Sequence, residues 1–276
     1  MKRPVHKSRP LFYEYAQSRR TVNLSIGKLR PILRCRKELK DSIPIFAEQI
    51  MANNILLLKD ANGKILDKYL SKGWYRSGKF VFTTRVVAPT QEDVYPVFWL
   101  RYNVIKVSHA AKNRKILDIN KQFYVQVRKF TLTEELKELH RVYVNSINFT
   151  TAATLEDLLM EIPARRFESY VIEVRDNRQL IAAGIFDKGT NSIAGIINFY
   201  RPEYKKYSPG KYVMLLKHQY CIENNIPLYY PGYYSIGLSV FDYKLFLDKN
   251  ATEVYLPDQN IWIPYLTFSK MISPTN

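Results

Sequence analysis

Apolar and polar positions along this chain favour strands from residue 54 to about 130 and alternating helices and strands after it. The segments 55–58, 79–83 and 97–107 are rich in apolar and aromatic residues, which favours strands, and 122–127 alternates like a half-buried strand. Asn62 and Gly63 follow the first of these segments and predict a tight turn there.

Beyond residue 130 the predicted elements come in a regular order. Thr133, followed by two glutamates, predicts the cap of a helix, and Thr154 predicts the cap of a second, short helix through 160. Three strands are then expected at 170–174, 180–186 and 192–200, with turns between them. A helix from 208, a strand at 228–234, another helix and a strand at 253–256 complete an α+β order with mixed strand pairing.

The first fifty residues have broken periodicity and repeated Arg-Pro pairs. They predict irregular structure with one or two short helices, such as one around 45–52. We therefore expect a basic N-terminal segment at 1–50, a smaller β-rich region at 51–130 and an α+β domain at 131–276.

The segment from Tyr200 to Lys244 carries the clearest functional signal. Ser208, Pro209 and Gly210 form a dense helix start, with a capping residue, a residue suited to the first turn and a glycine that lets a ligand approach the backbone. Such a helix start offers free N–H groups to a phosphate, carboxylate or oxyanion. The strand at 228–234 follows and places aromatic rings beside this turn.

The net charge of +17 in 276 residues favours a polyanionic partner. The first forty residues hold twelve Lys or Arg against Glu14 and Glu38, so much of the charge lies there. Nucleic acid is the first expectation and an anionic membrane the second, while a solvated basic tail without a partner is the alternative. No apolar run approaches the roughly 18 residues that span a bilayer, and no apolar stretch follows the basic N-terminus as in a secretory signal, so we expect a cytoplasmic protein.

The cysteines and histidines give no metal or disulfide pattern. Cys35 and Cys221 are too far apart in sequence for metal-ligand spacing and too few for a disulfide framework. The four histidines, which also lack metal spacing, are expected to be structural: His6, His109, His140 and His218.

Four motifs in register resemble the aminoacyl-tRNA–protein transferases, the arginyl- and leucyl-transferases of the N-degron pathway. The segment 73–78, Gly-Trp-Tyr-Arg-Ser-Gly, is similar to G-F-R-R-S-G of that family, and Arg101, 113–115 and Asn120 keep the spacing of its R…Q-R-R…N stretch. The segments 198–212 and 228–246 resemble FYDP…SLGTY and L-P-Y-x-Y-L-G-Y-W followed by Y-K-x-x-F. The resemblance covers roughly 70 to 260.

The resemblance implies an acetyltransferase-like (GNAT) fold, whose element order matches the one predicted here. That fold normally carries a Gly-rich pyrophosphate loop before its crossover helix, and only Gly210 remains of it here. The family's paired cysteines are also absent: Val94 and Val97 occupy one region and residues 1–30 contain no Cys. No thiol-bound metal cluster is expected, and the chain resembles a divergent branch.

The family reaction joins an amino acid from its tRNA ester to the N-terminal amine of a protein that begins with an acidic residue. The ester is already activated, so the reaction needs no enzyme nucleophile and no cofactor. By the resemblance, Asp187 binds the α-amine or accepts its proton, and Tyr200 and Tyr233 line the aminoacyl pocket or stack on the terminal adenine. The structural alternatives are a turn residue for Asp187 and core aromatics for the two tyrosines.

The same resemblance assigns a binding role to further residues. A basic set is expected to meet the acidic N-terminal residue or the tRNA backbone: Arg76, Arg101, Arg114, Lys115 and Lys244. Ser208, Gly210 and Tyr212, at the helix start, are expected to meet the terminal ribose or phosphate. The alternatives are a solvated basic face and an ordinary helix cap.

Two other functions remain open at this point. A CoA-dependent N-acyltransferase would use the same fold, although the Gly-poor turn at 206–211 argues against a pyrophosphate there. A non-catalytic RNA-binding protein on a degenerate transferase scaffold would explain the lost cysteines and would bind tRNA in a salt-dependent manner. Aminoacyl-tRNA and a protein N-terminus are the partners that the leading hypothesis names.

Overall fold

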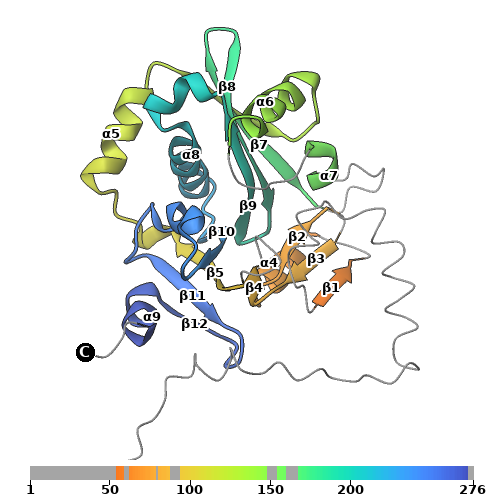
Figure 1. Cartoon of the computed structure of the whole chain (residues 1–276), viewed down its shortest axis with the longest axis vertical. Coiled ribbons are helices and arrows are strands. Elements are labelled where there is room, and N and C mark those ends of the chain that lie inside the picture. Colours follow the sequence, from red (N-terminus) through yellow and green to blue (C-terminus); the bar gives the residue numbers. More distant parts are fainter. Residues whose placement is uncertain are drawn as a thin grey trace, which may run out of the picture. The chain divides into compact units, whose positions relative to one another are not determined.

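A computed structural model describes residues 54–58, 62–78, 80–87, 94–147, 154–159 and 167–272, all within one compact unit that spans 43–276 (Figure 1). The basic segment at 1–50 and the helix expected around 45–52 lie outside the described residues.

A small antiparallel sheet comes first in the described part. Its strands are β1 (Asn54–Leu57), β2 (Tyr75–Ser77) and β3 (Phe80–Thr83), in the order β1-β3-β2. The strands expected at 55–58 and 79–83 are therefore confirmed. The turn predicted at Asn62 and Gly63 is wrong, because Asn62 is the N-cap of helix α4 (Gly63–Leu70) and its side chain accepts a hydrogen bond from Ile65 N at 3.1 Å.

A large mixed sheet forms the centre of the unit. Its order is β12-β11-β5-β10-β9-β8-β7-β6, with β4 paired to β5. The strands are β4 (Val86–Val87), β5 (Tyr95–Asn103), β6 (Tyr124–Lys129), β7 (Ser169–Asp176), β8 (Gln179–Lys188), β9 (Ser192–Tyr200), β10 (Leu228–Ser235), β11 (Thr252–Leu256) and β12 (Ile261–Pro264). The mixed pairing is confirmed. Because β5 and β6 precede residue 130, the sheet takes strands from both sides of the predicted domain boundary, which stays a prediction.

Helices cover both faces of the strands β7 to β9. Helices α6 (Glu134–Val144) and α7 (Leu155–Leu159) pack on one face with a core that includes Val171 and Ile185. Helix α8 (Pro209–Glu223) packs on the other face with Ile172 and Phe186, and α5 (Ala111–Asn120) lies against α8. Burial on both faces explains why these strands read as nearly continuous apolar runs.

The predicted helix starts are largely confirmed. The hydroxyl of Thr133 accepts from Leu136 N at 3.3 Å at the start of α6, and the hydroxyl of Thr154 accepts from Asp157 N at 3.0 Å before α7. The helix expected after the aromatic strand is the 3-10 helix η4 (Ser239–Leu245). Helices α5 and α9 (Tyr265–Ile272), strand β12 and the 3-10 helices η2 (Val104–Lys106) and η3 (Pro202–Tyr207) were not predicted.

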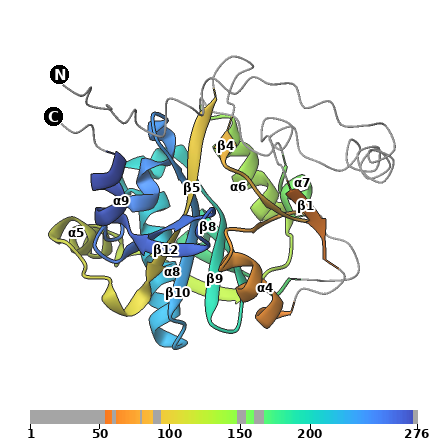
Figure 2. The same cartoon turned by 90° about the horizontal axis from the view of Figure 1, so that it is seen from below.

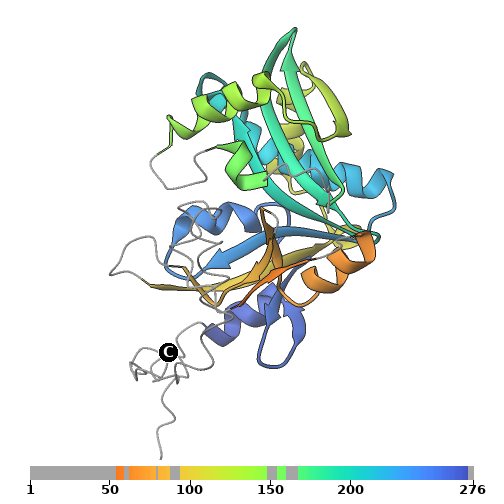
Figure 3. The same cartoon turned by 90° about the vertical axis from the view of Figure 1, so that its right-hand side faces the viewer.

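Strands β9 and β10 form the one parallel pair of the described sheet, and they stay together over a short distance. Their pairing comprises Leu228 with Ser192, Tyr229 with Ile193 and Tyr230 with Ala194. Beyond these positions β9 remains with β8 and β10 remains with β5, so the two strands diverge toward their carboxyl ends (Figure 3). Helix α8 is the crossover between them, and it returns the chain from the end of β9 to the start of β10.

Candidate active site

The backbone of β10 is irregular where it leaves β9. Its register with β5 shifts between Tyr229 and Gly232, which leaves Pro231 in the irregular part, where a residue without an N–H is tolerated. Gly232 has a φ of 102°, which a side chain would strain. A Cβ at this position would also lie 3.0 Å from Nζ of Lys244. The glycine therefore lets a buried lysine approach the strand.

Lys244 lies on η4, which folds back against β10. Its Nζ donates to the carbonyl oxygen of Tyr233 at 3.0 Å and lies 4.7 and 4.6 Å from the ring centroids of Tyr233 and Phe241. Among the described residues no carboxylate forms an ion pair with it. Burial lowers the pKa of Lys244 to about 7, so near neutral pH this amine exists in both protonation states. Lys244 was predicted as a binding residue from the sequence, and in the structure it lies between aromatic rings near the point where β9 and β10 diverge.

Asp187 and Arg76 form a buried ion pair that joins strand β8 to the motif at 73–78. Asp187 lies near the end of β8 with its side chain fully buried, and Arg76 Nη1 donates to its Oδ1 at 2.8 Å. The hydroxyl of Ser169 on β7 donates to the same oxygen at 2.6 Å. The other oxygen, Oδ2, is buried without a hydrogen-bond partner among the described residues. Asp187 thus belongs to the strand and does not start the exposed turn that was the structural alternative.

The guanidinium of Arg76 is used within the chain. Besides Asp187 and Ser169 it donates to the carbonyl oxygens of Gly78 at 2.8 Å and Leu159 at 2.7 Å. It also lies 4.6 Å from the ring centroid of Phe167. These contacts favour an action of Arg76 through Asp187 over a direct contact with a substrate carboxylate.

The neighbouring Tyr75 links the same motif to the aromatic strand. Its hydroxyl donates to the carbonyl oxygen of Tyr230 on β10, and its ring stacks on Trp99 at 4.9 Å. Trp99 in turn contacts the ring of Tyr233 at 5.2 Å. The structure therefore brings the segment 73–78, Asp187 and β10 together, although they are far apart in sequence.

Helix α8 follows β9 after the short 3-10 helix η3, and its start is capped differently from the prediction. Ser208 has a left-handed backbone (φ 54°), and its side chain makes no capping hydrogen bond, so the expected side-chain cap is wrong. The carbonyl oxygen of Ser208 accepts from Tyr212 N at 3.0 Å. A Cβ on Gly210 would lie 3.3 Å from the ring of Tyr200, so the glycine permits this close approach. Tyr212 is buried, and burial raises the pKa of its phenol.

Lys217 is a second buried lysine, which the sequence reasoning missed. It lies on α8 with 1% of its surface exposed, and its Nζ donates to Ile185 O at 2.9 Å and to Asn198 Oδ1 at 2.7 Å. Burial lowers the pKa of Lys217 to about 7, against the opposing effect of Asp187. A lysine four residues after Val213, on an otherwise apolar helical face, was the available signal.

The remaining predicted binding residues lie on other elements. Arg101 on β5 pairs with Glu253 on β11, with Nε 2.6 Å from Oε2, and its guanidinium lies 4.5 Å from the ring centroid of Trp262. Arg114 and Lys115 are exposed on α5, and Arg114 donates to the carbonyl oxygen of His109.

His109 and His218 contact each other through Nε2 and Nδ1 at 3.2 Å, and burial lowers the pKa of both imidazoles. His140 is buried against the ring of Phe199. Within the described residues no group of three or more His, Cys, Asp or Glu could hold a metal ion. Cys221 is fully buried, which raises the pKa of its thiol. The absence of a metal centre stays a prediction.

Comparison with known proteins finds one family that part of this chain resembles. Residues 117–251 match the family model described as arginine-tRNA-protein transferase, C terminus. Over this range the chain is similar to the aminoacyl-tRNA–protein transferases, and the relatives that it matches are named as enzymes of that family.

Individual relatives show the same similarity. An aspartate/glutamate leucyltransferase of Hahella chejuensis is 27% identical over 45% of this chain and 55% of its own length. One of Nitrosococcus oceani is 27% identical over 62% of this chain and 72% of its own length. Arginyl-tRNA--protein transferase 1 of Arabidopsis thaliana is 28% identical over 38% of this chain and 17% of its own length.

Two further comparisons concern the fold and membranes. The solved structure of FemX covers 76% of this chain and 69% of its own at 10% identity and a TM-score of 0.40, a similarity too low to assign the fold. Among the described residues, no helix is both long and apolar enough to cross a bilayer.

Proposed function

We propose that this protein transfers an amino acid, arginine or leucine, from aminoacyl-tRNA to the N-terminal amine of a protein that begins with an acidic residue. The observation that carries the proposal is the family match at 117–251. This range contains the diverging strands, the start of α8, Asp187, Lys244 and both candidate tyrosines. The names of the matched relatives support leucine and arginine as the groups transferred and acidic residues as the acceptors.

The chemistry requires a neutral amine, a stabilised oxyanion and two aligned substrates. Loss of a proton makes the amine nucleophilic; it attacks the ester carbonyl, and the ribose oxygen then leaves. Lys244, with a pKa of about 7, accepts a proton in its neutral form and holds an anionic group in its charged form. Asp187 holds the α-amine or accepts its proton through Oδ2, which has no hydrogen-bond partner among the described residues, and Arg76 orients this carboxylate. Positioning of the two substrates supplies most of the rate.

The finer assignments rest on the same proposal. The antiparallel strands β7 to β9, the crossover helix α8 and the parallel strand β10 support a GNAT-like domain. Tyr200 and Tyr233 line the aminoacyl pocket, and Ser208, Gly210 and Tyr212 meet the terminal nucleotide. Arg101, Arg114 and Lys115 bind the tRNA backbone. In this proposal the reaction needs no cofactor, takes place in the cytoplasm and belongs to the N-degron pathway.

A transfer assay tests the function. The full chain is mixed with radiolabelled arginyl-tRNA or leucyl-tRNA and with peptides that begin with Asp, Glu, Arg or Lys. Label is expected on the Asp and Glu peptides from one of the two tRNAs. No transfer from any charged tRNA to any peptide would overturn the proposal, and label from acetyl-CoA instead would support an N-acyltransferase.

A matched pair of variants tests the site. Lys244→Met removes the buried amine, whereas Lys137→Met makes the same substitution on α6, where Lys137 pairs with Glu134 and Glu156. Transfer is expected to fall at least tenfold in the first variant and to stay near wild type in the second. Equal transfer by both variants would show that Lys244 is not part of the site.

A further inference from the structure

Five exposed lysines lie on the first turn of α8 and on the two elements, α5 and η3, that contact this helix. Helix α5 contacts both η3 and α8, and η3 contacts α8. The lysines, here called the α5–η3 face, are Lys112 and Lys115 on α5, Lys205 and Lys206 on η3 and Lys211 on α8. Helix α5 lies at the outer edge of the unit in two perpendicular views (Figures 1 and 2).

Contacts with aromatic rings connect these lysines. The ammonium groups of Lys112 and Lys211 lie 5.7 and 5.2 Å from the ring centroid of the same residue, Phe246. On η3, the ammonium of Lys206 lies 5.0 Å from the ring centroid of Tyr207. The carbonyl oxygen of Tyr207 accepts from Asn120 at the end of α5 at 2.9 Å, which ties η3 to this helix. Lysines from three separate elements therefore share one surface.

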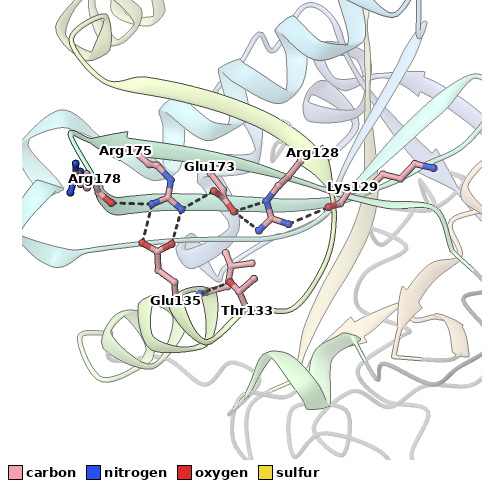
Figure 4. Close-up of polar contacts among 8 residues, drawn as sticks. Arg128, Lys129, Thr133, Glu135, Glu173, Arg175 and Arg178 are labelled. Atoms are coloured by element: carbon pink, nitrogen blue, oxygen red, sulfur yellow. Dashed lines mark hydrogen bonds and ion pairs between the residues drawn. The ribbon is translucent and has the colours of Figure 1, made fainter.

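The five lysines lack a carboxylate partner within the described part of the chain. None of the five lysines takes part in the ion pairs among the described residues, and the acidic Glu203 on η3 is exposed. At β6, β7 and α6, by contrast, two arginines pair with carboxylates (Figure 4). There Glu173 bridges Arg128 and Arg175, and Arg175 also pairs with Glu135. The α5–η3 face thus gathers five exposed lysines that no ion pair among the described residues neutralises.

We propose that the α5–η3 face binds the phosphate backbone of tRNA near its acceptor end. This inference rests on the proposed function, because it takes the start of α8 as the place of the terminal nucleotide. Lys211 is the next residue after Gly210, so the face continues directly from that place along η3 and α5. Lysine ammonium groups contact phosphates without reading bases, so the face holds any tRNA and leaves the choice of amino acid to the site.

The salt dependence of tRNA binding tests the face. Binding of fluorescently labelled tRNA without an attached amino acid to the full chain is measured by fluorescence anisotropy between 50 and 200 mM NaCl. In the triple variant Lys112→Gln/Lys206→Gln/Lys211→Gln, the plot of log association constant against log salt concentration is expected to become less steep. The magnitude of its negative slope should decrease by roughly 2 to 3, about 0.9 for each lost phosphate contact. The control is Lys64→Gln/Lys68→Gln/Lys72→Gln, which removes three exposed lysines on and just after α4 and is expected to keep the wild-type slope.

The possible outcomes separate this inference from the proposed function. An unchanged slope in the first triple variant, or an equal decrease in both, would overturn the α5–η3 face as the tRNA contact. Binding to vesicles of anionic phosphatidylserine with no binding to tRNA would also overturn it and assign the face to a membrane. A selective loss of tRNA binding together with no transfer by the wild type would support the face and overturn the proposed reaction.

Discussion

The ion pair between Arg76 and Asp187 gives the sharpest prediction about the site. In the wild type the side chain of Asp187 is fully buried and that of Arg76 is only 10% exposed. The substitution Arg76→Met therefore leaves the buried carboxylate of Asp187 without its cation. Removal of one partner of a buried pair costs about 3 to 5 kcal/mol because the other charge stays buried and uncompensated. The carbonyl oxygens of Gly78 and Leu159 lose donors as well, at roughly 1 kcal/mol each. This loss is a large part of a typical net stability of about 5 to 15 kcal/mol.

A double-mutant cycle measures the part that belongs to the pair. Urea unfolding at pH 7 is compared for wild type, Arg76→Met, Asp187→Asn and the double variant. The double variant holds no buried charge at this place, so its loss is expected to be smaller than the sum of the single losses by about 1 to 3 kcal/mol. Losses that add within about 0.5 kcal/mol would refute the buried pair as the cause.

Transfer by Arg76→Met also separates its two possible roles. If Arg76 acts by orienting Asp187, transfer is expected to fall for every accepted peptide under conditions where the variant is folded. A loss confined to peptides with an acidic first residue, with tRNA binding unchanged, would instead show direct contact between Arg76 and the substrate carboxylate.

Two other perturbations have expected results. The Lys217 amine releases its proton near pH 7 in the folded state but keeps it to about pH 10.4 in the unfolded state. The free energy of unfolding of the wild type is therefore expected to rise between pH 7 and pH 10 relative to that of Lys217→Met. The rise is at most about 1.4 kcal/mol per pH unit. Urea unfolding at pH 6.5, 8 and 9.5 measures this difference, and a constant difference would contradict it. Gly184→Ala is expected to cost about 1 to 3 kcal/mol, because the new Cβ would lie 2.1 Å from Val213 Cγ1 on α8. Thermal unfolding measures this cost, with Gly195→Ala as the control because a Cβ there would meet no atom closer than 3.3 Å. Equal losses of stability in the two variants would contradict the prediction and show that α8 can shift.

The local elements could be predicted from sequence because their signals are local. Thr133 and Thr154 cap helices through bonds to residues three positions away, and the strand at 192–200 has the bounds that its apolar pattern predicted. Asn62 was misread because asparagine before glycine suits both a tight turn and a helix N-cap. The spacing of Ile65, Leu66, Tyr69 and Leu70, which favours the helix, was the signal that decided the case.

The sequence by itself determined most of the helices and strands between 133 and 234, the aromatic strand after the helix at 208 and the resemblance of the four motifs to one family. The tertiary structure decided which of the named residues meet. Arg76 and Asp187 are 111 positions apart, and only the packing of β2 beside β7 and β8 brings them within hydrogen-bond distance. It also decided that Lys217 and Lys244 are buried, since desolvation depends on what covers a side chain. Capping and alternation act over a few residues, whereas pairing and burial depend on the order of strands in space.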